Sequence, residues 1–225
     1  MSSSTSTRPA PLQHDPELVR PEICGPEDGP DSTVFPVKLS GWVSRGFGRG
    51  SKDLGCPTAN LPDSSINPYY DTLSTGVYFG FARVLESETA TRESKKSAFN
   101  GGGEKGEDDK VHPMVMSIGW NPFYNNDTRT AEVHILHQYP SDFYGKELRV
   151  IMLGFIRPEY NYTSMDALIK DIEFDKQVAL RSTTTRPPYS AYQEDDFFFE
   201  PSKLEPTDED LSKPRVKPTE AASTA

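Results

Sequence analysis

The sequence predicts a mainly β protein, with a small antiparallel barrel followed by one α-helix. Three observations support this prediction. Short segments alternate apolar and polar residues, as strands with one buried face do. Turns rich in glycine, proline and asparagine separate these segments, and no helical pattern lies between most of them. Strong helical periodicity occurs once, after residue 163.

The strands are predicted where this alternation is clearest. They cover residues 34–43, 76–84, 114–119, 130–137 and 147–155. Residues 86–110 lose all apolar pattern, so we expect a polar insertion between two strands rather than a linker between domains. The insertion carries no recognisable chemistry, and its deletion should leave activity intact.

Thr163 should be the N-cap of the helix, because Asp166 three residues later completes a capping box. Apolar residues then follow at helical spacing as far as Ala179. Three consecutive phenylalanines at 197–199 come after the helix. Exposed, they would favour aggregation, so we expect them to dock on the domain.

Composition places one domain at residues 34–200, between disordered tails at 1–33 and 201–225. The tails are rich in proline and acidic residues, without periodicity. Residues 1–33 and 182–225 each carry a net charge of −4, so of the total of −10 only −2 remains between them. A domain so nearly neutral offers little to a phosphate backbone, which disfavours binding of nucleic acids.

Several sequence features bear on the compartment. No segment approaches the ~18 apolar residues of a membrane-spanning helix, and the first residues lack the apolar stretch of a secretory signal. The two cysteines, Cys24 and Cys56, form no disulfide framework. We therefore expect an intracellular, cytoplasmic protein, although the serine-rich start leaves organellar targeting open. Nothing requires a partner chain, so a monomer is expected.

Residues 46–60 hold the first candidate site. Their glycines allow the backbone to approach a phosphate, and Lys52 would add a positive charge. The spacing matches neither a Walker A loop nor a dinucleotide fingerprint, so a glycine-rich barrel corner explains it equally well. Thr58 and Asn60 share one face of an extended segment and offer the hard oxygen ligands that Mg2+ prefers. A turn in which both bond nearby backbone is the alternative.

The strand at 130–137 carries the second candidate. Alternation places Glu132 and His134 on one face and His137 on the other, so the two histidines should not share a zinc ion. A carboxylate inside a barrel is costly unless it is paired or functional, which makes Glu132 a candidate general base. A glutamate that merely faces solvent fits the pattern equally well.

The third candidate is the connection after the last strand, which contains Arg157, Tyr160 and Tyr162. A charged group among aromatic rings could hold a flat polar ligand by stacking and hydrogen bonding. A well-packed link from strand to helix is the alternative.

Taken in order, six segments resemble the eukaryotic, single-function riboflavin kinases: GFGRGSKDLGCPTANLP, STGVYFGFARV, MSIGWNPFYNN, EVHILH, DFYGKELRV and GFIRPEYNYTSMDALIKDIEFDK. The resemblance runs from about Val37 to Leu180. It implies a closed six-stranded antiparallel Greek-key barrel with a C-terminal helix. It also implies transfer of the γ-phosphoryl group of ATP to the ribityl 5′-hydroxyl of riboflavin, which gives FMN and ADP.

The resemblance further implies roles for individual residues. Thr58 and Asn60 would hold the divalent ion, expected to be Mg2+ with Zn2+ or Mn2+ as alternatives, and Glu132 would be the general base. Contacts to ATP are implied for Gly46, Lys52, Thr58, Ile135, His137 and Tyr144, and contacts to the flavin for Arg157, Tyr160 and Tyr162. The His-x-Gly-His signature of FAD-forming enzymes is absent from the sequence, so the product should be FMN. A non-catalytic flavin- or nucleotide-binding barrel is the alternative.

Overall fold

A computed structural model of the protein describes residues 11–44, 57–85, 106–120 and 129–204. Its centre is a six-stranded antiparallel sheet in the order β2-β7-β4-β5-β6-β3. The strands are β2 (Val37–Trp42), β3 (Ala59–Leu61), β4 (Gly76–Leu85), β5 (His112–Trp120), β6 (Arg129–Ile135) and β7 (Glu147–Arg157). Strands β4 to β6 form a meander and β7 returns beside β4, which is the Greek-key order. The predicted mainly β architecture is confirmed.

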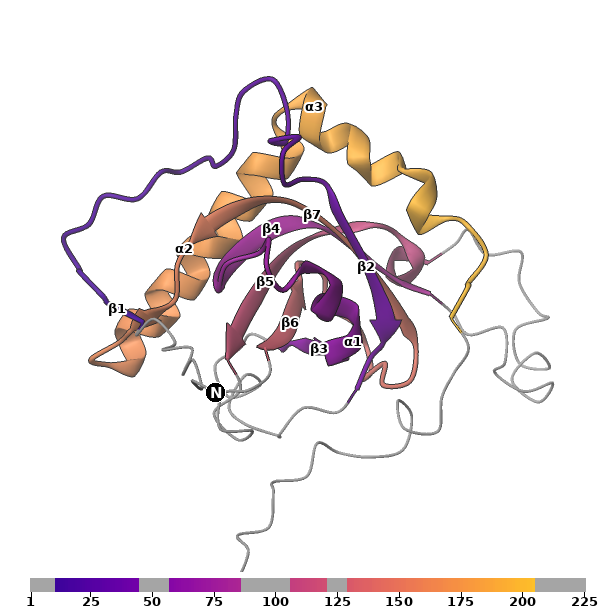
Figure 1. The fold of residues 1–225 in the computed structure, drawn as a ribbon, viewed down its shortest axis with the longest axis horizontal. Coiled ribbons are helices and arrows are strands. Elements are labelled where there is room, and N and C mark those ends of the chain that lie inside the picture. The colour runs from indigo at the N-terminus through magenta and orange to yellow at the C-terminus, as the bar shows by residue number, and fades with distance from the viewer. Residues whose placement is uncertain (1–10, 45–56, 86–105, 121–128, 205–225) are drawn as a thin grey trace, which may run out of the picture.

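The structure does not close the predicted barrel. The sheet curls into a half-barrel (Figure 1). Among the described residues, one isolated bridge links its two edges, from Ser44, two residues after β2, to Asn60 of β3. Strand β3 is only three residues long, because Pro62 follows it and helix α1 (Asp63–Ile66) begins at once. In the gap, the Ser65 hydroxyl donates to the Ser40 carbonyl at 2.7 Å and so satisfies part of the open β2 edge.

Strands β4 and β7 approach each other closely at Gly80. A Cβ at this position would lie 1.9 Å from the carbonyl oxygen of Ile151, so no other residue fits without a backbone shift. The register between the two strands also shifts between Phe79 and Gly80. Such bulges increase local twist, which is consistent with the strong curl of the sheet.

Successive side chains along each strand point to opposite faces of the sheet and so form two separate cores. Side chains on the concave face, such as Leu39, Met116 and Val133, fill the half-barrel. Phe79, Phe81 and other side chains of the convex face pack against the long helix α2 (Met165–Thr184). This helix begins one residue later than predicted. Its N-cap is Ser164, whose Oγ accepts a hydrogen bond from the Ala167 amide at 3.2 Å.

The C-terminal segment continues over the convex face through α3 (Pro187–Ser190), η5 (Ala191–Glu194) and η6 (Asp196–Phe198). The prediction that the phenylalanines dock is confirmed for Phe198, which is fully buried, while Phe199 stays half exposed. Figure 1 shows this segment leaving α2 and crossing toward β2.

Residues 11–33, which composition places in a disordered tail, contact α2 at several points. Cys24 is buried there, and its amide donates to the Ser182 hydroxyl at 2.9 Å. Strand β1 (Leu12–Gln13) pairs in parallel with β8 (Tyr160–Asn161). Residues 86–105 of the predicted insertion and 205–225 of the predicted C-terminal tail lie outside the described residues; η3 (Glu107–Asp109) belongs to the insertion's last turn.

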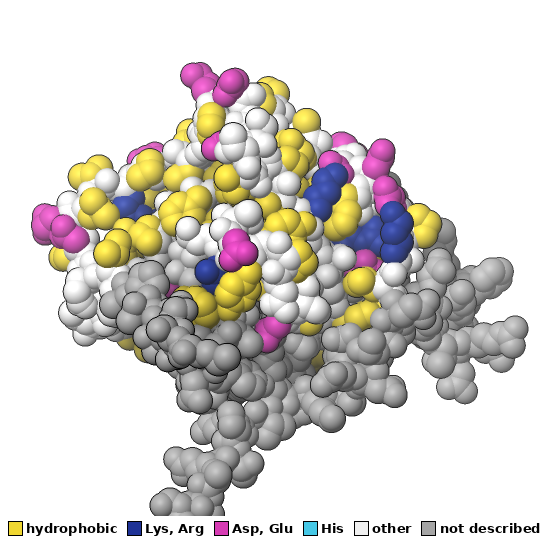
Figure 2. All heavy atoms as spheres, viewed as in Figure 1, with side chains coloured by type: hydrophobic (Ala, Val, Ile, Leu, Met, Phe, Trp, Pro, Cys, Tyr) yellow, Lys and Arg dark blue, Asp and Glu magenta, His cyan; other side chains and the backbone are white. Residues whose placement is uncertain are grey.

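Two further observations concern the surface. Within the described ranges, no helix combines the length and the apolar character needed to cross a bilayer. Figure 2 shows one face on which acidic and basic side chains form small separate groups among apolar ones. The described part of that face carries no continuous basic surface of the kind that binds a nucleic acid.

Candidate active site

One row of paired residues crosses the convex face of five strands. Val77 of β4 pairs with Arg157 of β7 on one side and with Ser117 of β5 on the other. Glu132 of β6 pairs with Ser117 and with Asn60 of β3. Directly paired residues point to the same face of a sheet. At about 4.8 Å per strand, Arg157 and Glu132 lie about 14 Å apart along this row.

Thr58, Asn60 and Glu132 meet at the β3–β6 end of the row. The Thr58 hydroxyl donates to Glu132 Oε2 at 3.2 Å. Asn60 is buried, whereas Thr58 and Glu132 are half-buried. Glu132 is therefore not inside the barrel, as the argument from burial assumed, nor freely solvated. Hydroxyl, amide and carboxylate oxygens on one surface suit a divalent ion that also binds water and phosphate.

His134 ties the strand that carries Glu132 to the segment before β3. Its Nδ1 lies 2.8 Å from the Pro57 carbonyl oxygen, and because a carbonyl only accepts, Nδ1 carries the proton. Burial lowers the pKa of His134, and this hydrogen bond opposes the shift only in part. Among the described residues, no three His, Cys, Asp or Glu side chains converge as a metal cluster. An ion held here would therefore need oxygen atoms of its phosphate ligand.

The connection from β7 to α2 lies at the other end of the row. Arg157 is buried, and its Nη2 lies 2.8 Å from Asp175 Oδ2 of α2. The Tyr162 hydroxyl donates to Asp171 Oδ2 at 2.7 Å. Burial raises the pKa of Tyr162, and the hydrogen bond to Asp171 adds to the shift. The Arg157 guanidinium carbon is 5.3 Å from the Tyr160 ring centroid, so charge and aromatic rings form one fixed surface.

The residues that the resemblance assigns to ATP are more scattered. Ile135 faces the inner core, and Tyr144 is partly exposed in the connection from β6 to β7. His137 follows β6, stacked on His112 with ring centroids 4.1 Å apart. Ile135 thus lies on the face of β6 opposite Glu132, and His137 follows Glu132 by five positions along the chain. Gly46 and Lys52 lie outside the described residues.

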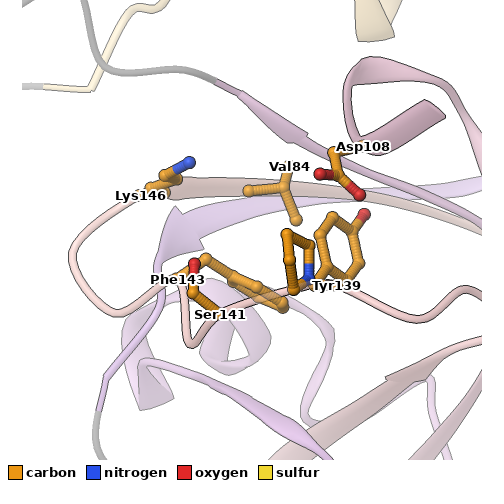
Figure 3. A pocket seen from close by; sticks show the side chains of 7 residues that line it. Val84, Asp108, Tyr139, Ser141, Phe143 and Lys146 are labelled. Carbon is orange, nitrogen blue, oxygen red and sulfur yellow. The ribbon is translucent and has the colours of Figure 1, made fainter. Parts of the chain in front are cut away.

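A hollow lies where the end of β4 meets the connection from β6 to β7 (Figure 3). It is lined by Val84, Asp108, Tyr139, Pro140, Ser141, Phe143 and Lys146. Asp108 Oδ1 is 2.7 Å from His137 Nε2, so the end of the predicted insertion touches a candidate nucleotide residue. The expectation that the insertion can be deleted without loss is therefore restricted to residues 86–105.

Two acidic residues of α2 were not singled out from the sequence. Asp171 and Asp175 hold Tyr162 and Arg157, respectively. Their spacing of four residues places them on one helix face, which is a signal in the sequence. This spacing alone does not predict a function, because the sequence does not tell what packs against that helix face.

Comparisons with known proteins identify the family of this chain. Residues 33–183 match the flavokinase family model, described as riboflavin kinase. The chain is 52% identical over 164 residues to the riboflavin kinase of Pyricularia oryzae, an alignment that covers 72% of this chain and 78% of that protein. It is 43% identical over 180 residues to the riboflavin kinase of Meyerozyma guilliermondii, covering 77% and 97%. The crystal structure of riboflavin kinase from Trypanosoma brucei shares the fold, with a TM-score of 0.54 at 24% identity over 79% of this chain and 95% of that one. This chain belongs to the riboflavin kinase family.

Proposed function

We propose that the protein is a riboflavin kinase, which transfers the γ-phosphoryl group of ATP to the ribityl 5′-hydroxyl of riboflavin and releases FMN and ADP. The row from Arg157 to Glu132 carries this proposal together with the family membership. Riboflavin is a flat ring with a hydroxylated five-carbon chain. A ring held beside Arg157 and Tyr162 directs that chain along the row, and its terminal hydroxyl reaches Glu132.

Glu132 is the proposed general base that accepts the proton of the 5′-hydroxyl. The hydrogen bond from Thr58 fixes the orientation of its carboxylate before the substrate arrives. Half-burial leaves one side of the carboxylate open to a substrate hydroxyl. Phosphoryl transfer depends mainly on positioning and charge neutralisation, which this arrangement provides.

Thr58 and Asn60 are the proposed protein ligands of a divalent ion. Such an ion, when bound, offsets the negative charge of the phosphates. Two neutral oxygen donors fit Mg2+, which keeps several waters and binds through substrate phosphates, and Zn2+ and Mn2+ remain alternatives. The proposed ATP contacts are Gly46, Lys52, Thr58, Ile135, His137 and Tyr144. The proposed flavin contacts are Arg157, Tyr160 and Tyr162.

Product analysis tests this function. The purified full chain, incubated with riboflavin, ATP and Mg2+, is expected to form FMN and ADP in equal amounts, without FAD, and EDTA should stop the reaction. Chromatographic separation of the flavins and the nucleotides reads out both products. Binding of riboflavin without formation of FMN would favour the non-catalytic carrier and overturn the proposal.

A further inference from the structure

We infer that Arg20, in the segment before the sheet, is a positioning residue that holds the flavin-binding surface in place through Asp171 and Asp175 of α2. The inference rests on the proposed function, because Arg157 and Tyr162 are its candidate flavin contacts. Arg20 is far from Glu132 in sequence and was assigned by composition to a disordered tail.

The two carboxylates are shared in the same way. Each presents its Oδ1 to Arg20: Asp171 Oδ1 lies 3.1 Å from Arg20 Nη1, and Asp175 Oδ1 accepts a hydrogen bond from Arg20 Nη2. Asp175 Oδ1 also accepts a hydrogen bond from Arg157 Nε at 3.2 Å, so this oxygen links the two arginines. Each presents its Oδ2 to the flavin-binding surface. Tyr162 donates to Asp171 Oδ2 at 2.7 Å, and Arg157 Nη2 lies 2.8 Å from Asp175 Oδ2. The fork of one guanidinium therefore spans two carboxylates that orient two separate flavin contacts.

The negative charges of the two carboxylates explain why the guanidinium of Arg20 is needed. Asp171 and Asp175 are one helical turn apart, and like charges at that spacing repel each other. Asp175 is 2% exposed, so its charge requires close partners. Without Arg20, Asp171 would lose its arginine partner and Asp175 would keep only Arg157, so the orientation of both flavin contacts would be less firmly fixed.

The segment that carries Arg20 is anchored on both sides. Before Arg20, β1 pairs with β8, and the imidazole of His14 lies 3.6 Å from Asp171 Oδ2. After it, the Cys24 amide donates to Ser182, and Arg186 donates to the Gly25 and Pro26 carbonyls at 3.0 and 2.9 Å.

The guanidinium of Arg20 also lies over the Phe174 ring, 4.7 Å from its centroid. These contacts hold Arg20 beside the carboxylates in one conformation, as a positioning role requires.

The test compares Arg20→Met and Arg20→Lys with a matched control, Glu22→Gln. Lysine keeps the charge, but its single ammonium group cannot bind both carboxylates as a fork does. Glu22 belongs to the same segment and pairs with Arg181 at the exposed surface, away from the two aspartates. The readouts are KM for riboflavin, KM for ATP, kcat, the melting temperature, and the riboflavin Kd from quenching of flavin fluorescence.

Arg20→Met is expected to raise KM and Kd for riboflavin about tenfold or more, with KM for ATP and kcat near wild type, because Glu132 lies three strands from Arg157. Arg20→Lys should recover part of this loss, and Glu22→Gln should behave as wild type. If Arg20→Met does not fold, the smaller rise expected for Arg20→Lys carries the same test. An unchanged riboflavin Kd, or equal rises in both KM values, would overturn the inference.

The outcome separates this inference from the proposed function. If the wild type binds riboflavin but makes no FMN, the kinase proposal fails while a rise in Kd in Arg20→Met still supports the positioning role. If the wild type makes FMN and the variants bind riboflavin equally well, the positioning role fails alone. Absence of riboflavin binding by the wild type overturns both.

Discussion

Glu132→Gln is expected to lower kcat by about 10²–10⁴-fold, the range that general-base assistance typically contributes. Glutamine has the shape of glutamate, and its side-chain oxygen still accepts the hydrogen bond from Thr58. It cannot accept the proton of the substrate hydroxyl. Steady-state kinetics with both substrates measure the effect, and KM for riboflavin and for ATP should stay near the wild-type values.

Folding should be unaffected by this change, because Glu132 is half-buried on the convex face and outside the inner core. Glu194→Gln is the matched control, since Glu194 is an exposed glutamate in η5 of the C-terminal segment. A near-normal kcat in Glu132→Gln would remove this residue from the chemistry. A loss of kcat in both variants would point to a general effect instead.

Arg149→Met is expected to destabilise the fold by about 3–5 kcal/mol, the cost of breaking a buried ion pair by removing one partner. Arg149 Nε donates to Glu147 Oε1 at 2.7 Å, and both residues are 3% exposed. Its Nη1 also donates to the carbonyls of Phe197 and Glu200, at 2.7 and 2.8 Å. The variant leaves the Glu147 carboxylate buried without its cation and releases the docked C-terminal segment. Urea unfolding at neutral pH measures the loss.

Two variants sharpen this prediction. Lys203→Met removes an exposed ion pair with Glu200 and should change stability by less than about 1 kcal/mol. Adding Glu147→Gln to Arg149→Met removes the unpaired buried charge, so the double variant should be more stable than Arg149→Met alone. If Arg149→Met and the wild type have the same midpoint urea concentration of unfolding, the ion pair does not stabilise the fold and Arg149 does not hold the C-terminal segment.

Regular patterns in the sequence predicted most of the fold. Alternation located β4, β5, β6 and β7 to within about two residues, and helical spacing located α2. Closure of the barrel was not predictable in this way, because it depends on how Pro62 and α1 shorten β3 and fill the gap. The packing of residues 11–33 was missed for a similar reason. That segment is held by single contacts such as Cys24 to Ser182, which leave no periodic signal.

The candidate site was predictable only in part. Residues two positions apart in an extended segment point to the same face, which predicted that Thr58 and Asn60 lie together, as they do in the structure. The 71 positions between Asn60 and Glu132 contain no pattern that predicts their pairing, and only the family resemblance joined them. The row to Arg157 requires the register of five strands at once, which composition and spacing do not encode.

We propose that phosphate, metal and the reacting hydroxyl meet at Thr58, Asn60 and Glu132. The most direct test is the Mg2+ concentration that gives half-maximal FMN formation, compared between wild type and Asn60→Ala. Mutation of residues that only hydrogen-bond a metal ligand typically costs about 10–100-fold in metal affinity. Removal of a proposed ligand should therefore raise this Mg2+ concentration at least about tenfold, with KM for riboflavin unchanged. The exposed Asn67→Ala, in the turn after α1, serves as control and should match the wild type. An unchanged Mg2+ requirement in Asn60→Ala would contradict the claim.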